Sequence, residues 1–162
     1  AEQISALKSG ERKLKLEATS LTQLIEYGLL ETSDRMREKN IKVDFKHSEE
    51  LTVRVDYELL VSCFVSILDH AIQHTSSAET ISVITGRNDN KTVIEIVDTG
   101  KNYTEKRLDD LQRHFIKKTG QLDLSLGIEL SLAQLIMELH SGEIGFLLKN
   151  QEAVAILLTF GR

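Results

Sequence analysis

The sequence of 162 residues has no proline, no tryptophan and a single cysteine, and aromatic residues make up only 5% of it. One cysteine excludes an internal disulfide and a metal site built from several cysteines, and it is typical of a reducing compartment. No apolar run approaches the roughly 18 residues that a membrane-spanning helix needs, and the polar N-terminus does not resemble a signal peptide. We therefore expect a cytoplasmic domain without membrane insertion of its own, either free or as the soluble part of a membrane-bound protein.

Positive charge is also sparse and dispersed. The net charge is −5, and the only dense basic group is the short stretch from Arg113 to Lys118. Nucleic-acid binding depends on clustered positive charge, so we expect no nucleic-acid partner. The hydrophobic content of 41% and the charged content of 28% are ordinary for a globular protein, and the length suits one domain with its own core.

Hydrophobic periodicity predicts alternating helices and strands, without repeats or an internal linker. Ser20 and Asp56 are good N-cap residues, and Gln23 is placed to complete a capping box with Ser20. Cys63 falls on the apolar side of its helix, and His140 ends the last helix, where a partial positive charge is favoured. Helices are expected at residues 20 to about 40, 56–75, 104–113 and 127–140, and strands near 14–16, 41–45, 51–55, 80–87, 91–98, 142–148 and 153–160.

These elements indicate a two-layer α+β sandwich, in which one mixed, mostly antiparallel sheet carries helices on one face. The apolar density of residues 80–87 and 91–98 predicts two central, largely buried strands. Residues 114–126 show little periodicity and are long for a connection, which is typical of a functional or mobile loop.

Three spaced features carry a family resemblance. A helix ends in "AIQHT", the strand "IEIVDTG" leads Asp98 and Gly100 into a loop, and "LGIELSLAQLIMELHSGEI" opens a helix with a glycine. In this order they resemble the ATP-binding domain of sensor histidine kinases, a Bergerat-type (GHKL) ATPase related to gyrase and heat-shock chaperones. The resemblance covers about residues 20–160. Residues 1–19 look like the end of the kinase's dimerisation hairpin and a junction, which leaves 20–162 as the ATPase domain.

The first motif of that family carries two asparagines one helical turn apart, the second of which ligates magnesium. Aligned through "AIQHT", these positions are Ser66 and His70. Imidazole suits zinc, copper or iron, whereas magnesium prefers oxygen, so His70 is a poor ligand at the metal position. The alternative is that His70 is an inert helix residue. Asp69 offers a carboxylate, but one residue along a helix rotates the side chain by about 100° about the helix axis, so Asp69 points away from the direction of His70.

The second motif, normally Asp-x-Gly-x-Gly, reads Asp98-Thr99-Gly100-Lys101-Asn102. The resemblance implies that Asp98 accepts a hydrogen bond from the adenine amino group; the alternative is a strand-end residue that caps its own loop. Asn102 replaces a glycine, and asparagine tolerates left-handed backbone well. In the long loop, Lys117 keeps a position from which it can reach phosphates, although a solvated lysine explains it equally well.

The third motif, a glycine-rich phosphate cradle at a helix N-terminus, keeps only Gly127. Side chains at Ser125 and Glu129 stand where backbone approaches the phosphates in the family. At 4 Å and an effective dielectric near 20, the carboxylate of Glu129 would repel a phosphate by about 4 kcal/mol. Acidic residues also favour the first turn of a helix, which is a structural reason for Glu129.

Two functions follow from the resemblance. In the first, the chain is a degenerate histidine-kinase ATPase domain with weak or absent Mg-ATP binding, a pseudokinase that acts as a regulatory module in two-component signalling. In the second, it is an active domain that binds ATP and Mg²⁺ and phosphorylates a histidine on its dimerisation hairpin, with the charge stabilisation typical of phosphoryl transfer. Both imply a response regulator and a homodimeric full-length protein as partners, and no catalytic residue within this chain is expected.

Overall fold

The computed structural model describes residues 13–47, 49–75, 77–98, 128–149 and 153–160. The expected helix at 104–113 and the loop at 114–126 lie outside the described residues, as do Gly100, Asn102, Lys117 and Gly127.

The main sheet has five strands in the order β2-β4-β5-β7-β6, and a separate two-stranded sheet pairs β1 with β3. β2 pairs with β4 in parallel, and the other neighbouring strands of the main sheet are antiparallel. The main strands are β2 (Lys42–His47), β4 (Thr80–Asn88), β5 (Lys91–Asp98), β6 (Glu143–Lys149) and β7 (Ala153–Phe160), and the small sheet contains β1 (Leu16–Ser20) and β3 (Thr52–Asp56).

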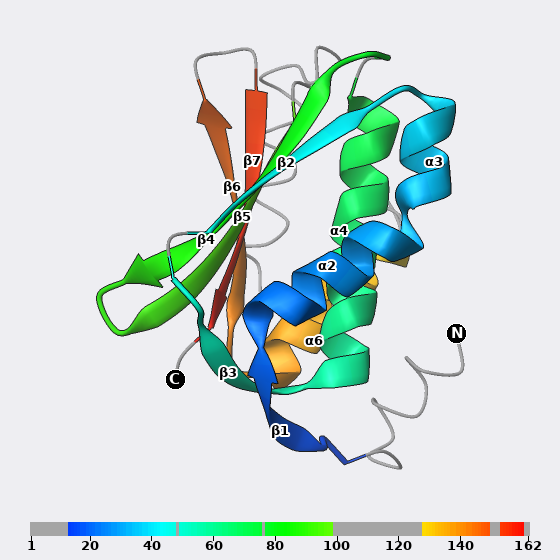
Figure 1. Ribbon diagram of the computed structural model, residues 1–162. Coiled ribbons are helices and arrows are strands. Elements are labelled where there is room, and N and C mark those ends of the chain that lie inside the picture. Colours follow the sequence, from blue (N-terminus) through cyan, green and yellow to red (C-terminus); the bar gives the residue numbers. More distant parts are fainter. Residues whose placement is uncertain (1–12, 48, 76, 99–127, 150–152, 161–162) are drawn as a thin grey trace.

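Helices lie on one face of the main sheet, which confirms the predicted two-layer α+β sandwich (Figure 1). They are α2 (Leu21–Glu31), α3 (Ser33–Glu38), α4 (Tyr57–His74) and α6 (Ile128–Leu139). α4 is the central helix, because it packs against both α2 and α6 and against β5. No helix among the described residues combines the length and the apolarity needed to cross a bilayer.

Both predicted N-caps form. The Ser20 hydroxyl accepts a hydrogen bond from the backbone N–H of Gln23 at 3.3 Å, and the Asp56 carboxylate accepts one from the N–H of Leu59 at 3.2 Å. Each cap satisfies an amide that the helix itself leaves without a partner. The ends of α4 and α6 agree with the expected helices to within one or two residues.

The single helix expected from residue 20 to about 40 is wrong, because the chain forms α2 and α3 with a break at Thr32. The Thr32 hydroxyl donates to the carbonyls of Gly28 and Leu29, both at 3.2 Å, and Ser33 Oγ donates to the carbonyl of Leu30 at 2.8 Å. These side chains compete with the backbone for the carbonyls of the last turn, which favours ending the helix there.

The expectation for β4 and β5 needs a correction. Both strands are central, but their burial alternates along the chain, so only one face of each is fully buried. Ile81, Val83, Ile94 and Ile96 on the inner face are 0% exposed, because the helices cover that face alone. Apolar residues on the outer face produced the dense pattern without adding a second covered side.

α2 and α4 approach closely at a glycine. A Cβ atom placed on Gly28 would overlap Cδ2 of Phe64 and lie 2.8 Å from Cε2 of the same ring, which is fully buried. Carbon atoms attract one another best at about 3.5–4.0 Å, so the two helices reach this separation only because Gly28 has no side chain.

Replacing Gly28 with alanine should therefore destabilise the fold. Alanine improves helix propensity by about 1 kcal/mol, but the overlap with Phe64 forces a costlier shift, so we expect a net loss of about 1–2 kcal/mol in the free energy of unfolding. Denaturant titration followed by circular dichroism measures it.

Gly86→Ala is the matched control, since nothing lies within 4 Å of a Cβ at this strand position. We expect it to be neutral or to stabilise by up to about 1 kcal/mol. Equal stabilities of Gly28→Ala and the unchanged chain would contradict the close packing of α2 on α4.

Candidate functional site

α4 and α6 run antiparallel in a defined register. At one end the backbone N–H of Asp56 donates to Nε2 of His140 at 3.0 Å, and further along Sγ of Cys63 lies 3.7 Å from the carbonyl oxygen of Ala133. A step of seven residues from Asp56 to Cys63 thus matches a step of seven residues from His140 back to Ala133. Two contacts separated by about two helical turns therefore agree on the same alignment.

This register determines which part of α4 lies beside the first residue of α6. Continued along the pair, it places Ile128, the first residue of α6, level with Leu68 of α4. The N-terminal end of α6 therefore lies level with the stretch of α4 between Ser66 and His70. A helix N-terminus presents unpaired N–H groups and a partial positive charge, so an anion is favoured at this level.

Asp98 lies at the same end of the sandwich. β4 starts six residues after α4 ends, and Val97 pairs with Ser82 close to that start. The alternation of β5 puts Asp98 on the helix-covered face with Ile94 and Ile96, and its side chain is 0% exposed. Asp98, Ser66, His70 and the start of α6 are thus gathered at one end, and we define them as the candidate nucleotide site.

The side chains at the metal position expected from the resemblance do not suit magnesium. His70 is 6% exposed, and Ser66, one turn earlier, is half-buried. Magnesium takes oxygen ligands in near-octahedral geometry, whereas these positions offer one imidazole and one hydroxyl. Nor do the described residues contain a group of three or more histidine, cysteine, aspartate or glutamate side chains that could hold a metal ion.

Side chains from α3 and its C-terminal end bind the C-terminal half of α4. Arg35 Nη1 lies 3.0 Å from both carboxylate oxygens of Asp69, and Lys39 Nζ donates to the carbonyls of Ile72 at 2.7 Å and Thr75 at 2.8 Å. Lys39 therefore caps the C-terminal carbonyls that a helix leaves without partners. Asp69 is thus bound by Arg35 of α3, and no feature of the sequence signals this contact.

The interpretation of His140 as a positive charge at a helix end is wrong. Its Nε2 accepts a hydrogen bond from the Asp56 N–H, which requires a lone pair on that nitrogen. Nδ1 lies 2.8 Å from the Ile136 carbonyl oxygen and therefore carries the proton that it donates there. The ring is thus neutral, because a protonated imidazole would present a donor to the amide of Asp56.

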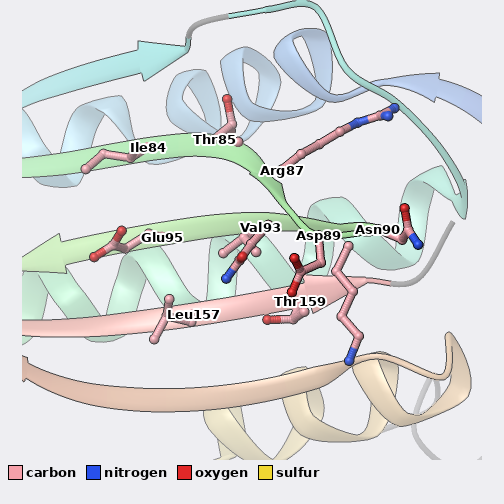
Figure 2. A pocket seen from close by; sticks show the side chains of 12 residues that line it. Ile84, Thr85, Arg87, Asp89, Asn90, Val93, Glu95, Leu157 and Thr159 are labelled. Carbon is pink, nitrogen blue, oxygen red and sulfur yellow. The ribbon is translucent and has the colours of Figure 1, made fainter.

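A groove among the described residues lies elsewhere, on the uncovered face of the sheet (Figure 2). It measures about 730 Å³ and is formed by the β4–β5 hairpin and β7, with Val93, Glu95 and Leu157 in its floor. The sheet separates this groove from α4, so the size of a cavity does not identify the candidate nucleotide site here.

Comparison with known proteins defines the class. The family described as "Histidine kinase-, DNA gyrase B-, and HSP90-like ATPase" matches residues 55–159. The adaptive-response sensory kinase SasA of Gloeothece citriformis (strain PCC 7424) is 32% identical over 146 residues, which are 87% of this chain and 37% of that protein. The chain therefore spans little more than a third of this relative's length.

Solved structures agree on the fold. The nucleotide-free catalytic domain of histidine kinase ThkA has a TM-score of 0.77 at 18% identity, and the match covers 91% of this chain and 97% of that one. Histidine kinase ThkA in complex with response regulator protein TrrA has a TM-score of 0.73 at 17% identity, with 98% and 46% covered. The chain belongs to the histidine kinase, gyrase B and HSP90-like ATPase family, and within it to the ATPase domains of histidine kinases.

Cys63, the only cysteine, should report on the contact between α4 and α6. Its side chain is 0% exposed, and burial raises the pKa of the thiol, so both access and thiolate formation are suppressed. We expect labelling by a thiol reagent to proceed no faster than opening of the folded chain, and to become rapid in denaturant. Rapid labelling under native conditions would contradict the α4–α6 packing.

His140→Phe should destabilise the domain, because it leaves the Asp56 amide without its acceptor. A buried polar group that loses its partner costs about 1–3 kcal/mol, measured as the free energy of unfolding. The control is Glu138→Gln, an exposed position on the same turn, for which a change within about 0.5 kcal/mol is expected. Equal effects of the two substitutions would mean that the His140 hydrogen bond does not stabilise the fold.

Proposed function

We propose that this chain is a degenerate histidine-kinase ATPase domain. It binds Mg-ATP weakly or not at all and acts as a regulatory, protein-binding module of a two-component signalling protein. The observation that carries the proposal is the burial of His70, which the family resemblance assigns to the magnesium position. A buried imidazole is held by its surroundings, so it does not give way readily to an oxygen ligand.

Asp98, at the end of the candidate site where the resemblance expects the adenine base, supports some nucleotide binding. Asp98 is fully buried at the end of β5, on the face covered by helices. By resemblance it is the carboxylate that would accept the adenine amino group, with Gly100 and Asn102 in the loop that follows. This favours weak nucleotide binding over none, and it keeps the active kinase as the second candidate function.

The phosphate end adds a second obstacle to binding. Gly127 is the only glycine of the cradle, and Lys117 and Glu129 supply charges of opposite sign in the sequence around it. The backbone N–H groups at the start of a helix favour phosphate binding, whereas the negative charge of Glu129 opposes it. We propose that Glu129 lowers phosphate affinity and that His70 lowers metal affinity.

The partners follow from the family. We propose that residues 1–19 connect this domain to a dimerisation hairpin of a longer, homodimeric protein on the cytoplasmic side, with residues 20–162 as the ATPase domain. Histidine kinase ThkA is known in complex with a response regulator protein. We propose a response regulator as the partner here as well, bound for regulation rather than for phosphoryl transfer.

Calorimetric titration with ADP and with a non-hydrolysable ATP analogue, in the presence of Mg²⁺, tests the proposal. We expect no binding tighter than millimolar for the unchanged chain. His70→Asn combined with Glu129→Gly restores the amide and removes the repelling carboxylate, so it should tighten binding by at least about tenfold. His47→Asn, the same exchange on the exposed edge strand β2, is the matched control and should not change affinity.

Micromolar binding by the unchanged chain would overturn the degenerate assignment and favour the active kinase. No gain in the double variant, with its fold intact by circular dichroism, would mean that His70 and Glu129 do not occupy the metal and phosphate positions.

A further inference from the structure

A second cavity lies at the end of the sandwich away from Asp98. It measures about 460 Å³ and lies between the small sheet and the β4–β5 hairpin, lined by Ala18, Thr52, Val53, Arg54, Arg87 and Thr92. Thr92 is six residues before Asp98 on β5, which corresponds to about 20 Å along the strand. The cavity is therefore separate from the candidate nucleotide site.

The charges of this cavity are of one sign. Arg54 from β3 and Arg87 from β4 both line it, and no carboxylate does. Within the part of the chain that the structure describes, neither guanidinium forms an ion pair. Figure 2 shows Arg87 extending away from the side chains of Asp89 and Glu95, the acidic residues nearest to it on the hairpin. Two positive groups from separate strands thus share one cavity in a chain of net charge −5.

Thr92 adds a buried donor to the same cavity. It pairs with Arg87 across β4 and β5, so both side chains lie on the same face of the sheet. Thr92 is 4% exposed, and its hydroxyl forms no hydrogen bond with any described residue. Its Oγ1 is not enclosed by the fold, so the hydroxyl can donate a hydrogen bond to an acceptor bound in the cavity.

We propose that this cavity binds a phosphate-type oxyanion, held by the guanidinium groups of Arg54 and Arg87 and by the hydroxyl of Thr92. Arginine presents a planar fork of N–H donors that matches the oxygens of phosphate, and such charge-assisted bonds are about twice as strong as neutral ones. The same chemistry accepts a free phosphate ion or the phosphate of a phosphorylated side chain. The site does not depend on nucleotide binding at α4.

Titration of the ¹⁵N-labelled domain with inorganic phosphate, at constant pH and ionic strength, tests the site by NMR. We expect saturable shifts of the backbone amides of Arg54, Arg87 and Thr92 with a millimolar dissociation constant. Arg54→Gln and Arg87→Gln should each weaken binding by at least about tenfold, the loss expected when a hydrogen bond to a charged group is removed. Both arginines are exposed, so these variants should keep the fold.

Arg87→Lys keeps the charge but loses the fork, and we expect a smaller loss, about threefold. The control is Arg37→Gln on α3, an exposed arginine outside the cavity, which should leave the affinity unchanged. A second titration with O-phosphoserine separates the sources: tighter binding than phosphate indicates a phosphorylated side chain, and equal binding indicates the free ion.

Two results would overturn the proposal. One is a set of shifts that chloride reproduces at the same ionic strength, which would indicate screening rather than binding. The other is phosphate binding of unchanged affinity in both Arg54→Gln and Arg87→Gln, which would place the anion elsewhere, for example at the start of α6.

Discussion

The antiparallel contact between α4 and α6 determines where the rest of the candidate nucleotide site lies. The neutral ring of His140 accepts the amide of Asp56 at one end, and Cys63 meets the Ala133 carbonyl seven residues further along. Because two helices packed side by side cannot slide without breaking such contacts, the start of α6 remains level with the turn from Ser66 to His70. The start of α6 is thus positioned by contacts at the far end and in the middle of the helix pair.

Local features of the fold were predictable from the sequence, and contacts between distant segments were not. The caps at Ser20 and Asp56 each depend on residues within a few positions of one another. The break at Thr32 depends on side-chain bonds that compete with a helix, which periodicity does not register. The acceptor role of His140 depends on Asp56, 84 residues away, and the cavity that Arg54 and Arg87 both line is formed by two different sheets.

The candidate site shows the same division. Asp98, Ser66 and His70 could be placed from motif spacing alone, because each is tied to an element with a recognisable pattern. The contacts that bind α3 to α4 could not be predicted from the sequence. They are the ion pair of Arg35 with Asp69 and the hydrogen bonds of Lys39 to the end of α4, and a lysine or arginine on a short helix carries no sign of its partner. The candidate site residues could therefore be proposed from the sequence, whereas the contacts that hold the surrounding helices together could not.

The two ends of the site differ in how a substitution can be tolerated. A carboxylate at an exposed position in the first turn of a helix is able to turn toward solvent, which reduces its repulsion of a phosphate well below the full Coulomb value. A side chain buried inside α4 has no such freedom, because its position is set by close packing. His70, at 6% exposure, is therefore the stricter obstacle of the two. Asp98 is fully buried as well, and it interacts with other groups in the fold, as a buried carboxylate must to offset the cost of losing water.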